Sequence, residues 1–161
     1  MGFSPGPMPL APQEVRTFFV TSVTAARRPI LPSERMANLL LRALQDYRNQ
    51  EKFLLHEFVI MPDHFHLLLT PSADVPLEKA VQYIKGGFSF RARKELDFQG
   101  SIWEASFTNH RIRDEHDYEH HRIYIRQNPV KRFLVETEER FPHSSAYAGS
   151  AVDPAQPWLK P

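Results

Sequence analysis

The sequence contains no cysteine. Disulfide bonds, zinc sites built from thiolates and cysteine nucleophiles are therefore all excluded. A chain without disulfides also suits a reducing compartment, so we expect a cytoplasmic protein.

The sequence also lacks a long hydrophobic run. No apolar stretch approaches the roughly 20 residues of a membrane span, and the N-terminus shows no charged region followed by an apolar core. We therefore expect neither a membrane segment nor a secretory signal. The 161 residues are 42% hydrophobic and 24% charged. That length and composition suit a single globular domain with a real core.

A strong net charge is missing as well, because the formal charge at pH 7 is only +1. The protein is therefore not expected to bind polyanions by bulk charge. The charge is nonetheless uneven, since residues 79–113 hold seven lysines and arginines against three acidic residues. A local basic surface of this kind suits a phosphate backbone, although a solvated helix face produces the same pattern.

The two ends of the chain differ from the middle. Residues 1–13 are predicted to be a flexible arm, and residues 146–161 a loosely held tail rich in proline and alanine. One domain, residues 14–145, lies between them. Its hydrophobic periodicity predicts strands at 14–24, 53–60, 65–70 and 101–112 and helices at 33–49, 77–96 and 114–127. This order predicts an α+β fold, an antiparallel sheet with flanking helices related to the ferredoxin-like arrangement.

Two features interrupt the predicted helices. Gly86 and Gly87 lie within the second helix and mark either a break or a point where another backbone comes close. Asn128 precedes Pro129, and a residue before proline disfavours helical geometry, so we expect the last helix to end there.

The stretch 58–70 reads FVIMPDHFHLLLT and is the centre of the sequence. Two apolar runs flank a short polar break, which predicts an antiparallel hairpin. Because successive side chains of a strand point to opposite faces, His64 and His66 share one face and Phe65 lies on the other. Two imidazoles on one face can converge on a metal ion. The spacing alone equally allows two half-buried histidines that are satisfied by hydrogen bonds.

The predicted last helix carries a second group of polar side chains. Tyr124 and Asn128 are four residues apart and Gln127 is three from Tyr124, so they lie near one face. His120 and His121 lie one turn earlier, on or near that face, and could support the site. If this helix crosses the histidine strand, two imidazoles and an amide oxygen would hold a metal ion beside a tyrosine. For the helix alone, an ordinary apolar core face with a C-cap is the commoner explanation.

A tyrosine beside such an ion has a chemical logic. Imidazole and oxygen ligands without thiolates suit Mg²⁺ or Mn²⁺, which can orient and polarise a phosphate. A tyrosine hydroxyl can attack phosphorus and become a covalent phosphotyrosine. Because the pKa of tyrosine is about 10, the ion must help to activate the hydroxyl or stabilise charge in the transition state.

These residues resemble the single-tyrosine HUH transposases and, within them, the REP-associated tyrosine transposases. The HUH signature of two histidines around a bulky hydrophobe matches residues 64–66, and MPDH precedes it at 61–64. The second signature, a tyrosine, three residues and then Asn or Gln, matches Tyr124 to Asn128 within YIRQNPVKRFLV. Weaker matches are IKGGFSFR at 84–91, SIW at 101–103 and HRIRD at 110–114. The resemblance covers residues 15–145.

The resemblance implies the HUH nuclease fold, with His64 and His66 as metal ligands on its central strand and Tyr124 as the nucleophile. Asn128 would be the third ligand of Mg²⁺ or Mn²⁺, and Gln127 is the second choice. The enzyme would cut single-stranded DNA, keep the 5′ phosphate as a phosphotyrosine and release a 3′ hydroxyl without ATP. Asp63 stands where relatives often have asparagine and is not expected to matter, since it need not be a ligand.

The resemblance also implies a partner, DNA palindromes that fold into hairpins, and a nucleoid-associated location. The side chains expected to bind DNA are Lys85, Arg91, Arg93, Lys94, Arg111 and Arg113. A monomer is favoured over a homodimer that exchanges the tyrosine helix. The alternative function is a hairpin DNA-binding protein that does not cut, whose binding would survive loss of His64 or Tyr124 and depend steeply on salt. A relaxase or replication initiator is disfavoured by the small size and the lack of a second domain.

Overall fold

Four strands form one antiparallel sheet in the order β2-β3-β1-β4. The computed structural model describes residues 15–31 and 33–157, so the predicted arm at 1–13 lies outside the described residues. The strands are β1 (Phe18–Val23), β2 (Phe53–Met61), β3 (His64–Pro71) and β4 (Thr108–Arg111). Only Pro62 and Asp63 separate β2 from β3, which confirms the predicted hairpin.

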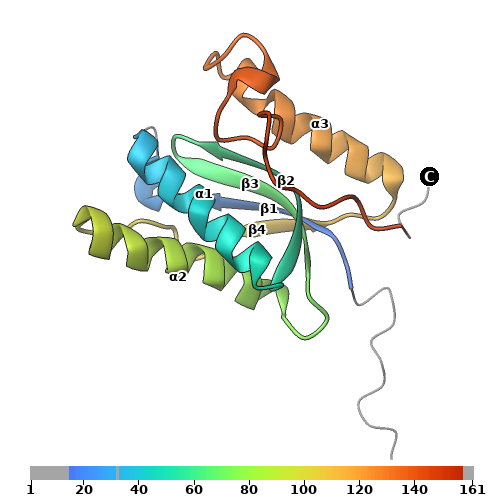
Figure 1. Cartoon of the computed structure of the whole chain (residues 1–161), viewed down its shortest axis with the longest axis horizontal. Helices are drawn as coiled ribbons and strands as arrows, with labels where there is room; N and C mark the ends of the chain where they lie inside the picture. The colour runs from blue at the N-terminus through green and yellow to red at the C-terminus, as the bar shows by residue number, and fades with distance from the viewer. Residues whose placement is uncertain (1–14, 32, 158–161) are drawn as a thin grey trace, which may run out of the picture.

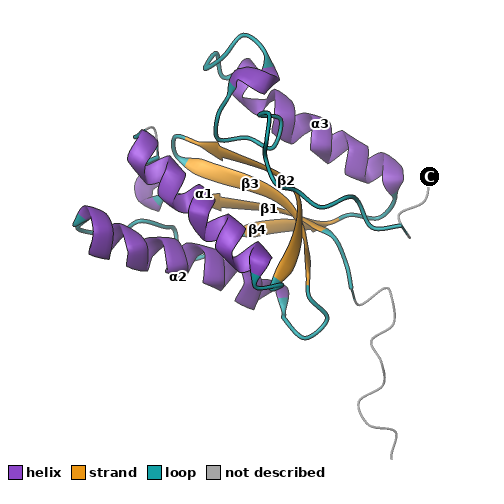
Figure 2. Cartoon of the chain, viewed as in Figure 1, coloured by secondary structure: helices purple, strands orange, loops and turns teal. Residues whose placement is uncertain are grey.

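Three helices cover the two faces of this sheet (Figure 1). Helices α1 (Glu34–Asn49) and α2 (Leu77–Leu96) lie against one face, and α3 (Glu115–Lys131) lies against the other. Figure 2 shows the sheet enclosed between these two helical layers. The predicted α+β fold with an antiparallel sheet is therefore confirmed. No helix of the described residues is long and apolar enough to cross a membrane.

The alternation of β3 divides its side chains between two cores. Phe65 and Leu67 are fully buried in the larger core under α1 and α2. Leu68 belongs to the smaller core under α3, together with Tyr118 and Ile125 of that helix. Each such apolar side chain contributes about 1.5–3 kcal/mol when it is removed from water. The register of β3 is therefore fixed, and His64 and His66 must face α3.

The glycine pair of α2 allows a close helix contact and does not break the helix. A Cβ atom on Gly87 would lie 2.5 Å from the hydroxyl oxygen of Tyr47 on α1, whereas a Cβ on Gly86 would meet nothing within 4 Å. Of the two expected explanations, close approach is the correct one, although the neighbour is a side chain and not a backbone. Of the two glycines, Gly87 is the one whose missing side chain allows α2 to pack on α1.

The last helix does not end at Asn128-Pro129, so that prediction is wrong. Helix α3 continues through Pro129 to Lys131. A proline in the last turn removes one N–H, and the preference against helix before it is small enough for packing to override. The chain leaves the helix at Phe133, whose φ of +61° is left-handed, while Leu134 N–H donates to the carbonyl of Pro129. Asn128 is therefore helical and lies one full turn after Tyr124.

The predicted strand at 101–112 is also shorter than expected, because only Thr108–Arg111 pairs with β1. Upstream of it, Trp103 forms a single bridge with Thr24 and donates its indole N–H to the carbonyl of Lys85. Ile102 is 2% exposed. The apolar pattern of this segment therefore reflects docking onto α2 and the core, which period-two alternation alone cannot distinguish from sheet pairing.

Residues 146–157 are fastened to the domain. The Asp153 carboxylate accepts a hydrogen bond from Leu55 N–H at 2.8 Å and pairs with Arg48 at 2.8 Å. Val152 packs against the larger core. These contacts hold the described part of the predicted tail along β2 and α1.

Candidate active site

His64 and His66 lie side by side on the face of β3 that α3 covers. Their ring centroids are 4.7 Å apart, and the two residues are only 4% and 5% exposed. Nδ1 of His64 donates to Oδ1 of Asp63 at 2.7 Å, and Nδ1 of His66 lies 2.7 Å from Oγ1 of Thr21. A partner on one ring nitrogen fixes the orientation of the ring and favours the other nitrogen as a metal ligand. The Nε2 atoms are therefore the candidate ligand atoms.

The surroundings keep both imidazoles neutral. Burial lowers the pKa of His66 to about 3, and the charges of His64, Arg132 and Arg27 act in the same direction. Burial also lowers the pKa of His64, although the Asp63 carboxylate opposes this effect. A neutral imidazole is the form that binds a metal ion. Both rings are therefore in the metal-binding form at neutral pH.

Tyr124 lies beside this pair in the same chain. Its ring centroid is 5.3 Å from that of His66, and Phe19 lies edge-on to it at 5.9 Å and stacks on His66 at 5.2 Å. Tyr124 is 42% exposed, so the residue is accessible to solvent. Tyr118, earlier on the same helix, is 7% exposed, and burial raises the pKa of its hydroxyl. Of these two tyrosines, only Tyr124 is placed to act as a nucleophile.

Asn128 fits a metal ligand, whereas Gln127 is occupied elsewhere. Oδ1 of Asn128 is buried and has no hydrogen-bond partner among the described residues. An unpaired buried amide oxygen costs about 1–3 kcal/mol, which an ion at this position would offset. Gln127 instead donates from Nε2 to Oε2 of Glu138 at 3.1 Å. The donor set of two imidazoles and one amide oxygen therefore fits Mg²⁺ or Mn²⁺.

The position of Asn128 on α3 supports the same conclusion. Tyr124, Asn128 and Arg132 follow one another at intervals of four residues, which places them along one side of the helix region. Tyr124 lies at His66, and the charge of Arg132 acts on both imidazoles. Asn128 lies between these two positions along the chain, so its side chain is on the side of α3 that faces the histidine pair.

The basic side chains expected to bind DNA lie apart from this site. Four of them belong to α2, which lies on the opposite face of the sheet from α3 (Figure 1), whereas His64 and His66 are on the α3 face. Lys85 donates to the carbonyl of Glu104, Arg91 pairs with Asp46, and Arg93 donates to the carbonyl of Gly100. Lys94 lies over the ring of Phe90. The structure therefore does not bring these four to the histidine pair, and their contact with DNA stays a prediction.

The remaining predicted residues lie around the start of α3. Arg111 and Arg113 are exposed, on the edge strand β4 and in the connection that follows it. His121 is half-buried, with its ring 4.7 Å from Phe19, and His120 is exposed beside it. The ring of Phe19 contacts His121 and also His66 and Tyr124, so it links His121 to the other two.

Four residues around the histidine pair were not predicted to take part in the site. For Asp63 the expectation that it would not matter is wrong, because its carboxylate holds the ring of His64. Asp63 and Thr21 hold the two Nδ1 atoms, and Arg27 pairs with Asp63 at 3.3 Å. The fourth residue is Arg132, whose positive charge lowers the pKa of both His64 and His66. Adjacency to His64 was a signal for Asp63, which contacts that imidazole without needing to be a metal ligand itself. Thr21 carries no such signal, because only the pairing of β1 with β3 sets it opposite His66.

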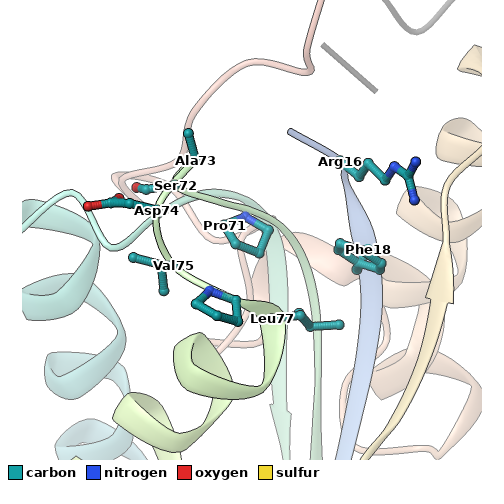
Figure 3. Close-up of a pocket in the computed structure, with 9 residues that line it drawn as sticks. Arg16, Phe18, Pro71, Ser72, Ala73, Asp74, Val75 and Leu77 are labelled. Carbon is teal, nitrogen blue, oxygen red and sulfur yellow. The ribbon is translucent and has the colours of Figure 1, made fainter. Parts of the chain in front are cut away.

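A hollow at the other end of the sheet does not belong to this site. It has a volume of about 410 Å³ and lies between the start of β1 and the connection from β3 to α2 (Figure 3). Its lining includes Arg16, Phe18 and residues 71–77, none of which is a histidine. The hollow is thus remote from the predicted chemistry.

The arrangement of an antiparallel sheet that presents two histidines to a tyrosine-bearing helix is that of the HUH class of enzymes. Residues 16–128 match the family model described as "Transposase IS200 like", which covers more than half of the chain. The chain belongs to the IS200-like transposase family and, by its relatives, to the REP-associated tyrosine branch.

The relatives confirm the resemblance seen in the sequence. An Escherichia coli REP-associated tyrosine transposase is 28% identical over 80% of this chain and 74% of its own length. A Haemophilus influenzae protein, described as a candidate member of the same group, is 34% identical over 53% of this chain, and the match spans only 54% of that relative. A solved REP-associated tyrosine transposase bound to a REP hairpin has a TM-score of 0.68 at 26% identity, covering 86% of this chain and 88% of that one.

Proposed function

We propose that the protein is a metal-dependent endonuclease and strand transferase that acts on hairpin-forming, single-stranded palindromic DNA through a 5′-phosphotyrosine. The observation that carries this proposal is the position of Tyr124 against His66 within one chain, with ring centroids 5.3 Å apart. A similar fold bound to a REP hairpin supports the choice of DNA substrate. DNA of this kind would place the enzyme at the nucleoid.

The residues divide the work between binding and attack. His64, His66 and Asn128 would hold Mg²⁺ or Mn²⁺, which when bound supplies positive charge to a scissile phosphate. The Tyr124 hydroxyl oxygen attacks phosphorus as its proton passes to solvent, and the bond from phosphorus to the 3′ oxygen breaks. The 3′ oxygen takes up a proton and leaves as a hydroxyl, while the 5′ phosphate stays on Tyr124. Attack by another 3′ hydroxyl reverses these steps and joins strands, so no ATP is consumed.

Two cations beside the histidine pair support a phosphate at this place. The charges of Arg27 and Arg132 both act on His66, and the Arg27 side chain is 60% exposed. Arg27 and the preceding Ala26 have left-handed φ values of +52° and +54°, which are uncommon for residues other than glycine. Arginine binds phosphate oxygens in a fixed fork geometry. We propose that Arg27 and Arg132 contact the DNA backbone next to the cut.

We further propose that the active site is complete in one chain. Tyr124 already lies beside His66 of its own β3, so no exchange of α3 with a second copy is needed to assemble the site. This arrangement supports the monomer that the sequence favours.

Trapping a covalent adduct tests the proposal. A labelled palindromic hairpin with single-stranded flanks, incubated with the protein and Mg²⁺ or Mn²⁺, should give a protein–DNA adduct that survives denaturing electrophoresis. Tyr124→Phe should abolish the adduct. Tyr118→Phe is the matched control on the same helix and should retain it.

An adduct that persists in Tyr124→Phe would contradict the assignment of the nucleophile. Hairpin binding with no adduct for any palindromic substrate would instead support the protein that binds DNA without cutting it. In that case binding should be unchanged by His64→Ala and should weaken steeply with salt.

A further inference from the structure

A second group of metal-ligating side chains lies where β4 meets the start of α3. His110 of β4 and Asp117 and His121 of α3 each offer one ligand atom, and these atoms all lie within 4.8 Å of one another. The ring of Phe19 lies between this group and the first, 4.7 Å from His121 and 5.2 Å from His66. The group is therefore separate from His64, His66 and Asn128.

The imidazoles of His110 and His121 both approach the carboxylate of Asp117. Nε2 of His110 lies 2.8 Å from Oδ2 of Asp117. Nδ1 of His121 lies 3.2 Å from Oδ1 of Asp117 and 2.8 Å from the carbonyl oxygen of the same residue. The centroids of the two imidazoles are 4.8 Å apart, close to the 4.7 Å that separates His64 from His66. Two nitrogens and two oxygens thus surround one small space.

We propose that His110, Asp117 and His121 form a second metal site, selective for Zn²⁺ or a similar transition-metal ion. Two imidazoles and one carboxylate are the protein ligands of many open zinc sites, in which a fourth position remains for water or another donor. Binding of an ion would replace the ring N–H hydrogen bonds to Asp117, and each ring proton would move to the other nitrogen of its imidazole. The first site, with an amide oxygen in place of a carboxylate, suits the harder ions Mg²⁺ and Mn²⁺.

The carboxylate is held ready for such an ion. Arg113 N–H donates to Oδ2 of Asp117 at 3.0 Å, and Asp114, the N-cap of α3, accepts from Asp117 N–H at 2.8 Å. Burial alone would raise the pKa of Asp117, but the hydrogen bonds from Arg113 and His110 outweigh it and lower that pKa. Outer contacts of this kind fix ligands and strengthen metal binding.

An ion can reach the group from solvent. A hollow of about 350 Å³ opens there and is lined by His110, Arg113, Asp114, His116, Asp117 and His120. The bound ion would join β4 to the first turns of the helix that carries Tyr124. Because His121 and Tyr124 both contact Phe19, the ion would also stiffen the support of the nucleophile.

Counting bound Zn²⁺ by isothermal titration calorimetry tests the site. The His64→Ala/His66→Ala protein should still bind one equivalent of Zn²⁺ when Mg²⁺ is in excess. Adding His110→Gln or Asp117→Asn should remove that equivalent, whereas His116→Gln, an exposed histidine on the rim of the same hollow, should leave it. The Zn²⁺ should also raise the Tm of the double variant, because it binds only the folded state.

Two results would overturn the proposal. One is the absence of Zn²⁺ binding in the His64→Ala/His66→Ala protein, and the other is binding that His110→Gln and Asp117→Asn leave unchanged. If the double variant does not fold, the wild-type protein provides the same test, because His110→Gln should lower its Zn²⁺ stoichiometry by one equivalent. None of these readouts depends on DNA cleavage, so this proposal can fail while the nuclease assignment stands.

Discussion

The hydroxyl of Thr21 lies 2.7 Å from Nδ1 of His66, and the two residues stand opposite each other across β1 and β3. This contact orients an imidazole whose other nitrogen is the candidate metal ligand. Outer contacts of metal ligands typically contribute about 10–100-fold in metal affinity.

Thr21→Val should therefore weaken Mn²⁺ binding by about tenfold or more while the protein stays folded. Thr17→Val is the control, because the substitution makes the same chemical change at a hydroxyl that bonds to Thr70, away from the histidine pair. Calorimetric titration with Mn²⁺ measures both. Equal affinities in the two variants would show that Thr21 does not position the ligand.

The two neighbouring carboxamides of α3 should behave differently when truncated. Asn128→Ala should abolish the covalent DNA adduct and lower Mn²⁺ affinity, because it removes the buried oxygen that has no other partner among the described residues. Gln127→Ala should leave both nearly unchanged, since its amide contacts Glu138. Calorimetry measures the Mn²⁺ affinity of both variants, and denaturing electrophoresis measures their DNA adduct. If Gln127→Ala lost both properties and Asn128→Ala kept them, Gln127 would be the metal ligand.

The two glycines of α2 should respond in opposite directions to alanine. Gly87→Ala should destabilise the protein by about 1–3 kcal/mol, because the added methyl group would overlap the Tyr47 ring. Gly86→Ala meets open space and should stabilise the helix by about 0.5–1 kcal/mol. Urea unfolding measures both free energies. A stable Gly87→Ala protein would mean that Tyr47 swings away at little cost.

His56 should make the fold sensitive to acid. It is buried, and its ring nitrogens contact the carbonyl oxygen of Asp153 and the hydroxyl of Thr70. Burial lowers the pKa of His56, while in the unfolded chain the group titrates near its ordinary pKa of about 6.5. The unfolded state therefore takes up the proton first, so this stability is fully present above about pH 6.5 and is lost as the pH falls below it.

Urea unfolding at about pH 7.5 and about pH 5.5 measures this effect. The free energy of unfolding should fall between the two, and His56→Gln should reduce that fall. His116→Gln, which alters an exposed histidine, should leave the fall unchanged. A fall of the same size in wild type and His56→Gln would assign the acid sensitivity to other buried histidines, such as His66.

The sequence supplied the parts of the site that depend on local spacing. His64 and His66 share a face because a strand has a period of two, and Tyr124 and Asn128 share a side because a helix has a period near four. Those periodicities hold wherever the elements form. The choice of Asn128 over Gln127 gains its support from the fold, since only packing shows which amide oxygen is left unpaired.

The continuation of α3 and the shortness of β4 were decided by packing. Local preference placed a helix end before Pro129, but that preference is weaker than the contacts of α3 with β2 and β3, so the helix continues. The apolar residues 101–107 resemble a strand, yet burial of Ile102 and Trp103 against α2 explains the same pattern. Local propensity is a weak prior that tertiary contacts override.

The sequence by itself determined that two imidazoles and a phenol are available and that each is presented on a definite face of its own element. Only the tertiary structure decided that Thr21 and Asp63 orient the imidazoles, and that His110, Asp117 and His121 meet. Such meetings depend on strand register and on the helix packed over the sheet, and they join residues whose separation along the chain has no fixed period.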